Sequence, residues 1–543
     1  MNINKTGDVL NEKKTDKEDL DIILFLCNWG PHAAFQELQD GASEILTEVK
    51  MVRIPCSGRI SKALLFKPFE LGAAGVALVG CEPGTCRYGT GTETARKNVE
   101  DTRGILKLLG LGENRLHHAT FLPEESEALQ QFLADFTSDI KNIGKSPVLP
   151  SPKTESEMTS DELVKGIVNL QDIYACQDCG KCSSACSLTL SGKTFSPRTI
   201  ANDVIAGNLD STAVQQDIWA CLTCGLCYDR CPSAVNFSEF VRDMRHVLKV
   251  GGSDGCEVHG GFLHSLMRTM TTPNLSANHW EWLPEDIQLD DDNKILFFGG
   301  CAPYFDLFFK KYLGVQTCNI LVDSLRLLNF FDIHPAVLQD ERCCGHDLLW
   351  SGDKENFLRL AKLNVEALHD RGIQEVITSC PECYRTFSYD YPQQGIEMHF
   401  KVTHIYDLLE NEIDKGAVKF KKFNHKMTFQ DPCRLSRLEN RPDLPRKLLN
   451  RLTPKSFQEM RDRGSSAICC GNSAWTGCDS YSKALQVKRI RQAHETGSNL
   501  LVTACPKCQI HLQCAMEDPI IGKELNIEMM DLTSVLAKTI QWE

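Results

Sequence analysis

The sequence predicts a multidomain protein with an N-terminal α/β domain on a parallel sheet, a mainly helical cysteine-rich domain and two repeated α/β domains. The chain has 543 residues, which is too long for one hydrophobic core. Near the N-terminus, short apolar runs alternate with helical patterns, as is typical of parallel sheets. The C-terminal half contains two similar stretches about 130 residues apart, which indicates an internal repeat.

The composition is that of a globular protein, with 42% hydrophobic and 24% charged residues. Acidic residues (72) outnumber basic ones (59), which argues against a nucleic-acid-binding surface. The charged N-terminus lacks the pattern of a signal peptide, and no apolar run reaches the roughly 18–20 residues that span a bilayer. We therefore expect a cytoplasmic protein without a transmembrane segment. Its 26 cysteines then indicate metal ligands, because the cytosol keeps thiols reduced.

The first domain is predicted at residues 21–140, after a disordered tail at 1–20. Three apolar runs end in cysteine, "DIILFLC", "VKMVRIPC" and "GVALVGC", and "CEPGTC" adds another. Parallel sheets bind ligands beyond the carboxyl ends of their strands. We therefore expect four thiols to gather there and bind a metal cluster: Cys27, Cys56, Cys81 and Cys86. The alternative is that buried cysteines simply finish buried strands.

The second domain is predicted at residues 161–270, after a polar linker at 141–160. It contains "CQDCGKCSSAC" and "CLTCGLCYDRC", and both read C-x2-C-x2-C-x3-C. This spacing is typical of ferredoxins with two [4Fe-4S] clusters, in which the last cysteine of each motif binds the other cluster. The predicted ligand sets are Cys176, Cys179, Cys182 with Cys231, and Cys221, Cys224, Cys227 with Cys186. Zinc, the alternative metal, normally prefers two pairs of ligands separated by a longer loop.

The repeats are predicted at residues 294–415 and 424–543, after a linker at 271–293. Equivalent cysteines are 132, 126 and 125 residues apart for Cys301 and Cys433, Cys344 and Cys470, and Cys383 and Cys508. Each repeat carries five cysteines where a β-rich run meets a helical one: Cys301, Cys343, Cys344, Cys380, Cys383, and Cys433, Cys469, Cys470, Cys505, Cys508. Each repeat is therefore predicted to be a small α/β domain with its thiols at one edge.

Five thiols per repeat are one more than a cubane cluster needs. The fifth favours a bridged or opened cluster with an iron that can take an external ligand. The glycine after each cysteine doublet allows a close backbone turn, so that both neighbouring sulfurs can face one metal. The doublets, Cys343 with Cys344 and Cys469 with Cys470, are thus the predicted catalytic residues.

The repeats resemble the CCG domains of the heterodisulfide reductase B subunit, whose pattern is C-x(n)-C-C-G-x(n)-C-x-x-C. With the ferredoxin-type segment they resemble a fusion of its C and B subunits, as in a D-like subunit. The 41 residues between Cys301 and Cys343 are long for this family and predict a loop insertion. Residues 21–140 resemble the D subunit of methyl-viologen-reducing hydrogenase, which carries a [2Fe-2S] cluster. Its usual "CNWC" is "CNWG" here, with Gly30 in place of a cysteine, and its "CHY" is Cys86-Arg87-Tyr88.

The resemblance implies one [2Fe-2S] cluster, two ferredoxin-type [4Fe-4S] clusters and two noncubane [4Fe-4S] clusters that flank a disulfide substrate. No G-x-G-x-x-G follows a predicted strand, and there is no P-loop. Any flavin or nucleotide is therefore expected on another subunit. The resemblance implies as partners a flavin-containing A-like subunit and a hydrogenase or formate dehydrogenase. One alternative is a purely electron-transferring subunit that connects such partners to a quinone or another acceptor. A zinc-stabilised scaffold is a weaker alternative.

Several residues near or outside these motifs have both a functional and a structural interpretation. Four residues beside the repeat cysteines are candidates to line a substrate pocket, or serve only packing and ion pairs: His346, Arg434, Asn472 and Trp475. Four cysteines fall outside every motif: Cys256, Cys318, Cys478 and Cys514. Of these, Cys318 lies in an amphipathic run and is expected in the core.

We predict that the anaerobically purified protein is brown and carries about eighteen irons, two in one [2Fe-2S] cluster and four in each of four further clusters. Iron and acid-labile sulfide analysis checks this number. Stoichiometric zinc with little sulfide would contradict every electron-transfer interpretation.

Overall fold

The computed structural model describes residues 20–151, 160–416, 418–452 and 456–542. Most of the predicted tail at 1–20, and residues 152–159 of the predicted linker, lie outside the described residues. The chain divides into two compact units, the first drawn mainly from residues up to 148 and the second mainly from residue 149 onward. None of the described helices is long and apolar enough to cross a membrane.

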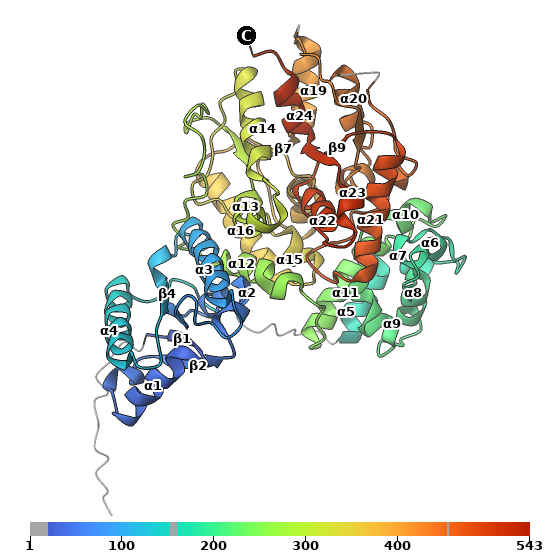
Figure 1. The fold of residues 1–543 in the computed structure, drawn as a ribbon. Coiled ribbons are helices and arrows are strands. Elements are labelled where there is room, and N and C mark those ends of the chain that lie inside the picture. Colours follow the sequence, from blue (N-terminus) through green and yellow to red (C-terminus); the bar gives the residue numbers. More distant parts are fainter. Residues whose placement is uncertain (1–19, 152–159, 417, 453–455, 543) are drawn as a thin grey trace, which may run out of the picture. The chain divides into compact units, whose positions relative to one another are not determined.

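The first unit contains the predicted parallel α/β sheet (Figure 1). Its strand order is β2-β1-β3-β4, and all neighbours are parallel. The strands are β1 (Ile22–Cys27), β2 (Lys50–Ile54), β3 (Gly75–Gly80) and β4 (Leu116–Thr120). The helices that follow these strands are α1 (Gly30–Asp40), α2 (Lys62–Glu70), α3 (Gly91–Leu108) and α4 (Ser126–Ile143). The first three strands end at, or within two residues of, Cys27, Cys56 and Cys81, as predicted.

The core of this sheet shows why the helices form where they do. Leu129, Leu133 and Phe136 recur at helical spacing along α4 and are buried, together with Phe35 of α1. These side chains pack against strand residues such as Val79. The apolar stripes of α1 and α4 therefore cover the sheet, as expected for amphipathic helices.

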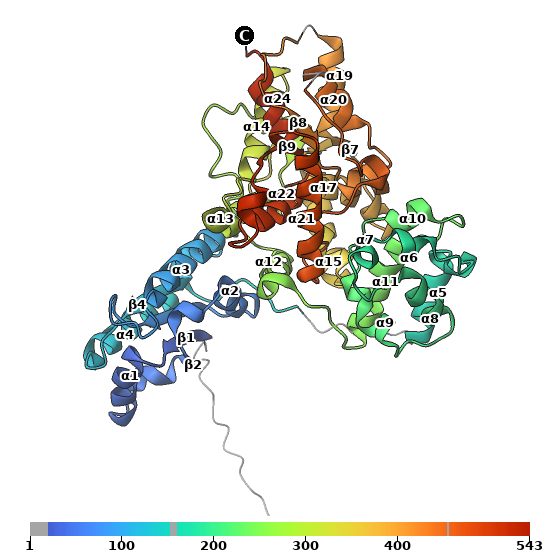
Figure 2. The same cartoon turned by 45° about the vertical axis from the view of Figure 1, so that its right-hand side comes forward.

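The second unit begins with the helical, ferredoxin-type region (Figure 2). Short helices follow the cysteine loops, and α6 and α10 begin after Gly180 and Gly225, whose φ angles are +75° and +77°. The helices are α5 (Ser160–Leu170), α6 (Lys181–Ala185), α7 (Ser187–Leu190), α8 (Pro197–Ile205), α9 (Thr212–Gln215), α10 (Leu226–Arg230), α11 (Phe237–Val250) and α12 (Phe262–Thr269).

The two repeats have matching parallel sheets of three strands, in the orders β5-β6-β7 and β10-β9-β8. The first repeat has β5 (Ile295–Phe298), β6 (Glu375–Thr378) and β7 (Lys401–His404), and the second has β8 (Met427–Phe429), β9 (Leu500–Thr503) and β10 (Glu528–Asp531). This confirms the prediction of two repeated α/β domains. In both repeats, cysteines follow the first two strands within four residues.

The helices of the repeats correspond less closely than the strands. The first repeat has α13 (Ala302–Leu313), α14 (Cys318–Phe330), α15 (His346–Trp350), α16 (Lys354–Asp370), α17 (Pro381–Arg385), the π-helical turn η7 (Thr386–Asp390), α18 (Tyr391–Gln393) and α19 (Ile405–Lys415). The second has the π-helical turn η8 (Arg434–Leu438), α20 (Leu444–Leu452), α21 (Ser480–Glu495), α22 (Pro506–Met516), α23 (Gly522–Leu525) and α24 (Leu532–Thr539). A regular helix thus follows the first cysteine of repeat one, and a π turn follows that of repeat two.

One hydrophobic core joins the two repeats. Phe297 and Ile377 of the first sheet belong to the same buried cluster as Phe429 and Val502 of the second. No helix or strand lies between the end of α12 and the start of β5, where a linker is predicted. Trp280 in this stretch is nevertheless buried in the shared core, so the segment is packed against the repeats.

Candidate metal centres

The four N-terminal cysteines lie together at the carboxyl edge of the first sheet. The sulfurs of Cys27 and Cys81 are 3.6 Å apart, and both side chains are buried. Burial raises the pKa of Cys81 to about 11. Cys56 and Cys86 interact with each other and lie within electrostatic reach of the other two. The arrangement brings four thiols to one place, and their role as ligands remains a proposal.

Two glycines adjoin these thiols where larger residues would interfere. A Cβ on Gly91 would lie 2.7 Å from the sulfur of Cys86 and 2.8 Å from that of Cys56. Gly30 begins α1 and donates its backbone N–H to the sulfur of Cys81 at 3.3 Å. Gly30, which stands where the related family has a cysteine, thus contributes a backbone hydrogen bond in place of a thiol. Four other thiols are still present.

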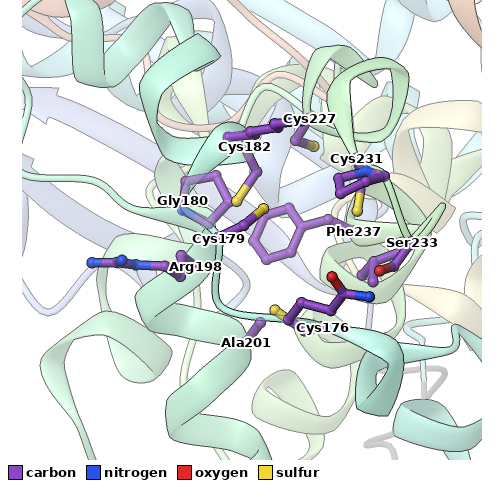
Figure 3. Close-up of a pocket in the computed structure, with 15 residues that line it drawn as sticks. Cys176, Cys179, Gly180, Cys182, Arg198, Ala201, Cys227, Cys231, Ser233 and Phe237 are labelled. Atoms are coloured by element: carbon purple, nitrogen blue, oxygen red, sulfur yellow. The ribbon is translucent and has the colours of Figure 1, made fainter.

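The ferredoxin-type cysteines line two neighbouring cavities. The first, about 480 Å³ with its open mouth, is lined by five cysteines: Cys176, Cys179, Cys182, Cys227 and Cys231. Figure 3 shows the sulfurs of Cys176, Cys179, Cys182 and Cys231 turned toward its centre. The second, about 380 Å³, is lined by Cys186, Cys221, Cys224 and Cys227. Cys227 lines both cavities. Apart from it, the first cavity combines three cysteines of the first motif with Cys231, and the second combines cysteines of the second motif with Cys186, which is the grouping expected for two cubane clusters.

The first repeat gathers its five cysteines in one buried pocket, lined by Cys301, Cys343, Cys344, Cys380 and Cys383. The sulfurs of Cys301 and Cys343 are 2.8 Å apart. The adjacent Cys343 thiol raises the pKa of Cys344 well above its ordinary value. Crowded thiols of this kind lose their protons together only when a cation such as iron neutralises them.

The second repeat gathers the equivalent five cysteines. Cys433 interacts with Cys469, and Cys508 interacts with both Cys470 and Cys505. The sulfur of Cys470 also lies 3.3 Å from Nδ1 of His511. Each repeat therefore gathers its five thiols at one place, which we call its thiol pocket, and the donor set fits an iron–sulfur cluster in both.

The glycine after each doublet has the predicted conformational role. Gly345 and Gly471 have φ angles of +85° and +97°, in the region that favours glycine. A Cβ on Gly471 would lie 2.6 Å from the carbonyl oxygen of Ser482. The close turn after each pair of cysteines therefore requires glycine.

A buried ion-pair network joins the two thiol pockets. Glu382 and Lys507 occupy equivalent positions in the two C-P-x-C motifs, and their side chains are 2.7 Å apart. Lys507 also pairs with Asp347 and helps to line the pocket of the first repeat. Cys505 is within electrostatic reach of Cys380, the equivalent cysteine of the other repeat. The two thiol-rich edges therefore face each other.

The second ferredoxin motif packs directly on the second repeat. Three buried arginines donate hydrogen bonds to its backbone carbonyls: Arg245 to Cys221 at 2.7 Å, Arg434 to Thr223 at 2.5 Å and Arg437 to Cys224 at 2.6 Å. The hydroxyls of Thr223 and Ser473 are 2.7 Å apart. We call this contact, with its three arginines, the arginine junction.

The comparisons with known proteins agree with this arrangement. Models of three families match: the methyl-viologen-reducing hydrogenase delta subunit at residues 22–144, a 4Fe-4S dicluster domain at 172–235, and a cysteine-rich domain (CCG) at 295–388 and 427–513. Over 123 residues the chain is 31% identical to the vhc iron–sulfur D protein of F420-non-reducing hydrogenase from Methanococcus voltae, covering 85% of that protein and 23% of this chain. Through its N-terminal domain, the chain belongs to the hydrogenase delta-subunit family.

The remainder of this delta-subunit-family chain is similar to parts of subunits of other oxidoreductases. The D subunit of dihydromethanophenazine:CoB–CoM heterodisulfide reductase from Methanosarcina barkeri is 30% identical over 239 residues, which are 42% of this chain and 56% of that protein. The B subunit of fumarate reductase (CoM/CoB) from Methanothermobacter marburgensis is 28% identical over 253 residues, or 46% of this chain and 48% of that protein. The chain thus spans about half the length of these relatives.

The candidate residues named beside and outside the cysteine motifs lie in different surroundings. His346 is buried between the two thiol pockets, where Arg434 donates to its Nε2 at 3.1 Å. Trp475 is buried against Phe309, and the side chain of Asn472 donates to the carbonyl of Thr476. Cys318, expected in the core, is only half-buried at the start of α14.

Sequence reasoning missed several charged residues of the site: Arg245, Asp347, Glu382, Arg437 and Lys507. One signal was present, because the aligned C-P-x-C motifs carry opposite charges at the same position. Arg245 had no such signal, since it lies on a helix distant in sequence from every cysteine motif of the repeats.

We predict that Gly91→Ala removes the cluster of the N-terminal domain and no other. The added methyl group would overlap the sulfurs of Cys56 and Cys86, because their distances from it are below 3.0 Å. The expected result is loss of about two irons and of one paramagnetic signal. Gly166→Ala is the control, since a Cβ there meets nothing within 4 Å. Full iron content in Gly91→Ala would contradict ligation by these cysteines.

Proposed function

We propose that this chain is the iron–sulfur subunit of a heterodisulfide reductase-like complex and that it reduces a disulfide between its two CCG domains. The observation that carries the proposal is the pair of five-thiol pockets that face each other across Glu382 and Lys507. A relay that passes single electrons needs only one such pocket. Cleavage of a disulfide takes two electrons and produces two thiolates, which two facing centres can receive.

The proposed order of the redox sites follows from their neighbours. The N-terminal domain would accept electrons from a partner through a [2Fe-2S] cluster at its four cysteines. The two ferredoxin-type clusters would follow. Because the arginine junction packs Cys224 close to Cys469, the second ferredoxin motif would serve the second CCG domain first. The first CCG domain would then receive its electron across the facing edges.

The residues that would hold the catalytic clusters are the five cysteines of each CCG domain. When bound, an opened cluster supplies an electron and an iron that takes a soft thiolate ligand. The protein contributes the enclosure, since Cys343, Cys344, Cys469 and Cys470 are all buried. The ion pairs of Lys507 with Asp347 and Glu382 hold the two edges in register.

The partner proteins implied by this function would supply the electrons. Relatives of the chain are named as subunits of heterodisulfide reductase, fumarate reductase and hydrogenase. We propose a flavin-containing A-like subunit and a hydrogenase or formate dehydrogenase as partners. The alternative is that the chain transfers electrons to a quinone or another acceptor without disulfide chemistry. The following experiment distinguishes this alternative from disulfide reduction.

We predict that Cys344→Ser or Cys470→Ser alone abolishes disulfide reduction. Serine is a harder and less acidic ligand than cysteine, so each substitution should disrupt the cluster of its own domain. The ferredoxin-type clusters should remain reducible, because their eight cysteines lie in a separate segment. Reductase assays with an artificial donor, combined with paramagnetic spectra of the oxidised protein, measure both effects.

The control for this pair is Cys256→Ser, which changes an exposed cysteine outside every motif. It should keep wild-type iron content and activity. If either doublet can be lost with reductase activity intact, two-centre cleavage is wrong. The electron-transfer alternative would then account better for the chain.

We predict that Cys81→Ser stops electron entry through the N-terminal domain without affecting disulfide reduction at the CCG domains. The variant should lose reduction by the physiological hydrogenase or dehydrogenase, because the N-terminal cluster would be lost. It should keep disulfide reduction with a small artificial donor, which can reach the later clusters directly. Unchanged activity with the physiological donor would contradict the role of this domain as electron acceptor.

A further inference from the structure

The three guanidinium groups of the arginine junction are buried without a carboxylate partner in the part of the chain that the structure describes. Arg434 donates to His346, to Ser473 and to the carbonyl and hydroxyl of Thr223, and none of these is a carboxylate. Arg437 donates to the carbonyls of Cys224, Ser465 and Ala467. Arg245 donates to those of Ile218, Trp219, Cys221 and Trp350. Three cations therefore lie in the interior, and no described carboxylate forms an ion pair with them.

The carboxylates within electrostatic reach of these arginines belong to other cations. Glu382 is bound by Lys507, and Asp431 is bound through both oxygens by Arg446. Asp390 pairs with Arg242 and Arg385. Two donor atoms of the junction also remain unused: Arg245 Nε and Arg437 Nη2 are buried and have no hydrogen-bond partner among the described residues. Unpaired charges and donors of this kind are costly in a protein interior, so an anionic partner is expected.

The proposed clusters are the anions within reach. Arg434 Nη1 lies 4.0 Å from the sulfur of Cys433, and Arg437 is within electrostatic reach of Cys224, Cys433 and Cys469. Arg245 is likewise within reach of Cys221. The junction therefore faces the second ferredoxin-type cavity on one side and the second CCG pocket on the other.

The first repeat lacks this feature. Arg434 and Arg437 stand one and four residues after Cys433, whereas Ala302 and Phe305 stand at those positions after Cys301. The cation that lines the first pocket, Lys507, is neutralised by two carboxylates. The nearby Arg342 donates instead to carbonyls of residues 270–273. The two pseudo-equivalent pockets thus have different electrostatic surroundings.

We propose that Arg245, Arg434 and Arg437 make the two clusters beside the arginine junction easier to reduce than the other two clusters of this unit. The proposal rests on the proposed function, because clusters must be bound at these cysteines. Reduction adds one negative charge to a cluster, and a buried cation stabilises that charge strongly because the surroundings screen it weakly. Electrons would accumulate beside the second CCG domain before they reach the first.

The test is a redox titration of the full-length, anaerobically purified protein without substrate, followed by visible and paramagnetic spectra. The wild-type protein should show two [4Fe-4S] midpoint potentials above the other two. In Arg437→Gln and Arg434→Gln the amide can still donate to a carbonyl, but the charge is gone. We expect each variant to shift the reduction equilibrium of the upper pair by about tenfold, or about 59 mV for a one-electron couple, toward lower potential.

Two matched variants separate charge from structure. Arg437→Lys keeps the cation and should retain the wild-type potentials. Arg115→Gln removes another buried arginine, which donates to three backbone carbonyls in the first unit, and should leave all four potentials unchanged.

The outcomes distinguish this inference from the function on which it rests. Absence of the four [4Fe-4S] clusters from the wild-type protein overturns the proposed function. Clusters that are present but unshifted in both glutamine variants overturn the inference alone. If the glutamine variants lose iron, Arg437→Lys decides between the two explanations. Retained iron and wild-type potentials in this variant support a role of the charge. Loss of iron in it shows that the junction supplies hydrogen-bond geometry rather than charge.

Discussion

The constraint on which this structure depends is the crowding of thiols in buried pockets. Each CCG domain brings five sulfurs together, and neighbouring thiols raise the pKa of Cys344 in one domain and of Cys508 in the other well above the ordinary value. Several thiolates crowded in this way are stable only when bound iron supplies the opposite charge. Two features bring the sulfurs together: the close glycine turns at Gly345 and Gly471, and the positions of the cysteines at strand ends.

The shared core turns two separate pockets into one site. Phe297 and Val502 belong to a single buried cluster, so the two repeats pack against each other through one core. The pairing of Glu382 with Lys507 then uses equivalent positions of the two repeats in opposite charge states. A duplicated domain has in this way become an asymmetric pair, with a bound lysine at one pocket and buried arginines at the other.

The cysteines and the fold classes were predictable from the sequence for physical reasons. A cluster accepts ligands only at particular spacings, so C-x2-C-x2-C-x3-C and the CCG doublets carry their meaning in local sequence. The parallel sheets were predictable because strands and helices alternate, and because glycine and cysteine mark the strand ends. The packing of Trp280 was not, since the stretch around it reads as a polar linker and is buried only through contact with the core.

The sequence by itself determined which thiols form each set and on which kind of element they lie, because ligand spacing and strand periodicity are local properties. Only the tertiary structure decided which sets are neighbours. Arg245 and Arg434 are far apart along the chain, and their meeting at Cys221 and Thr223 follows from the packing of the ferredoxin-type region on the second repeat. The charge around a buried site is set by every element that packs on it, and no local sequence pattern encodes that sum.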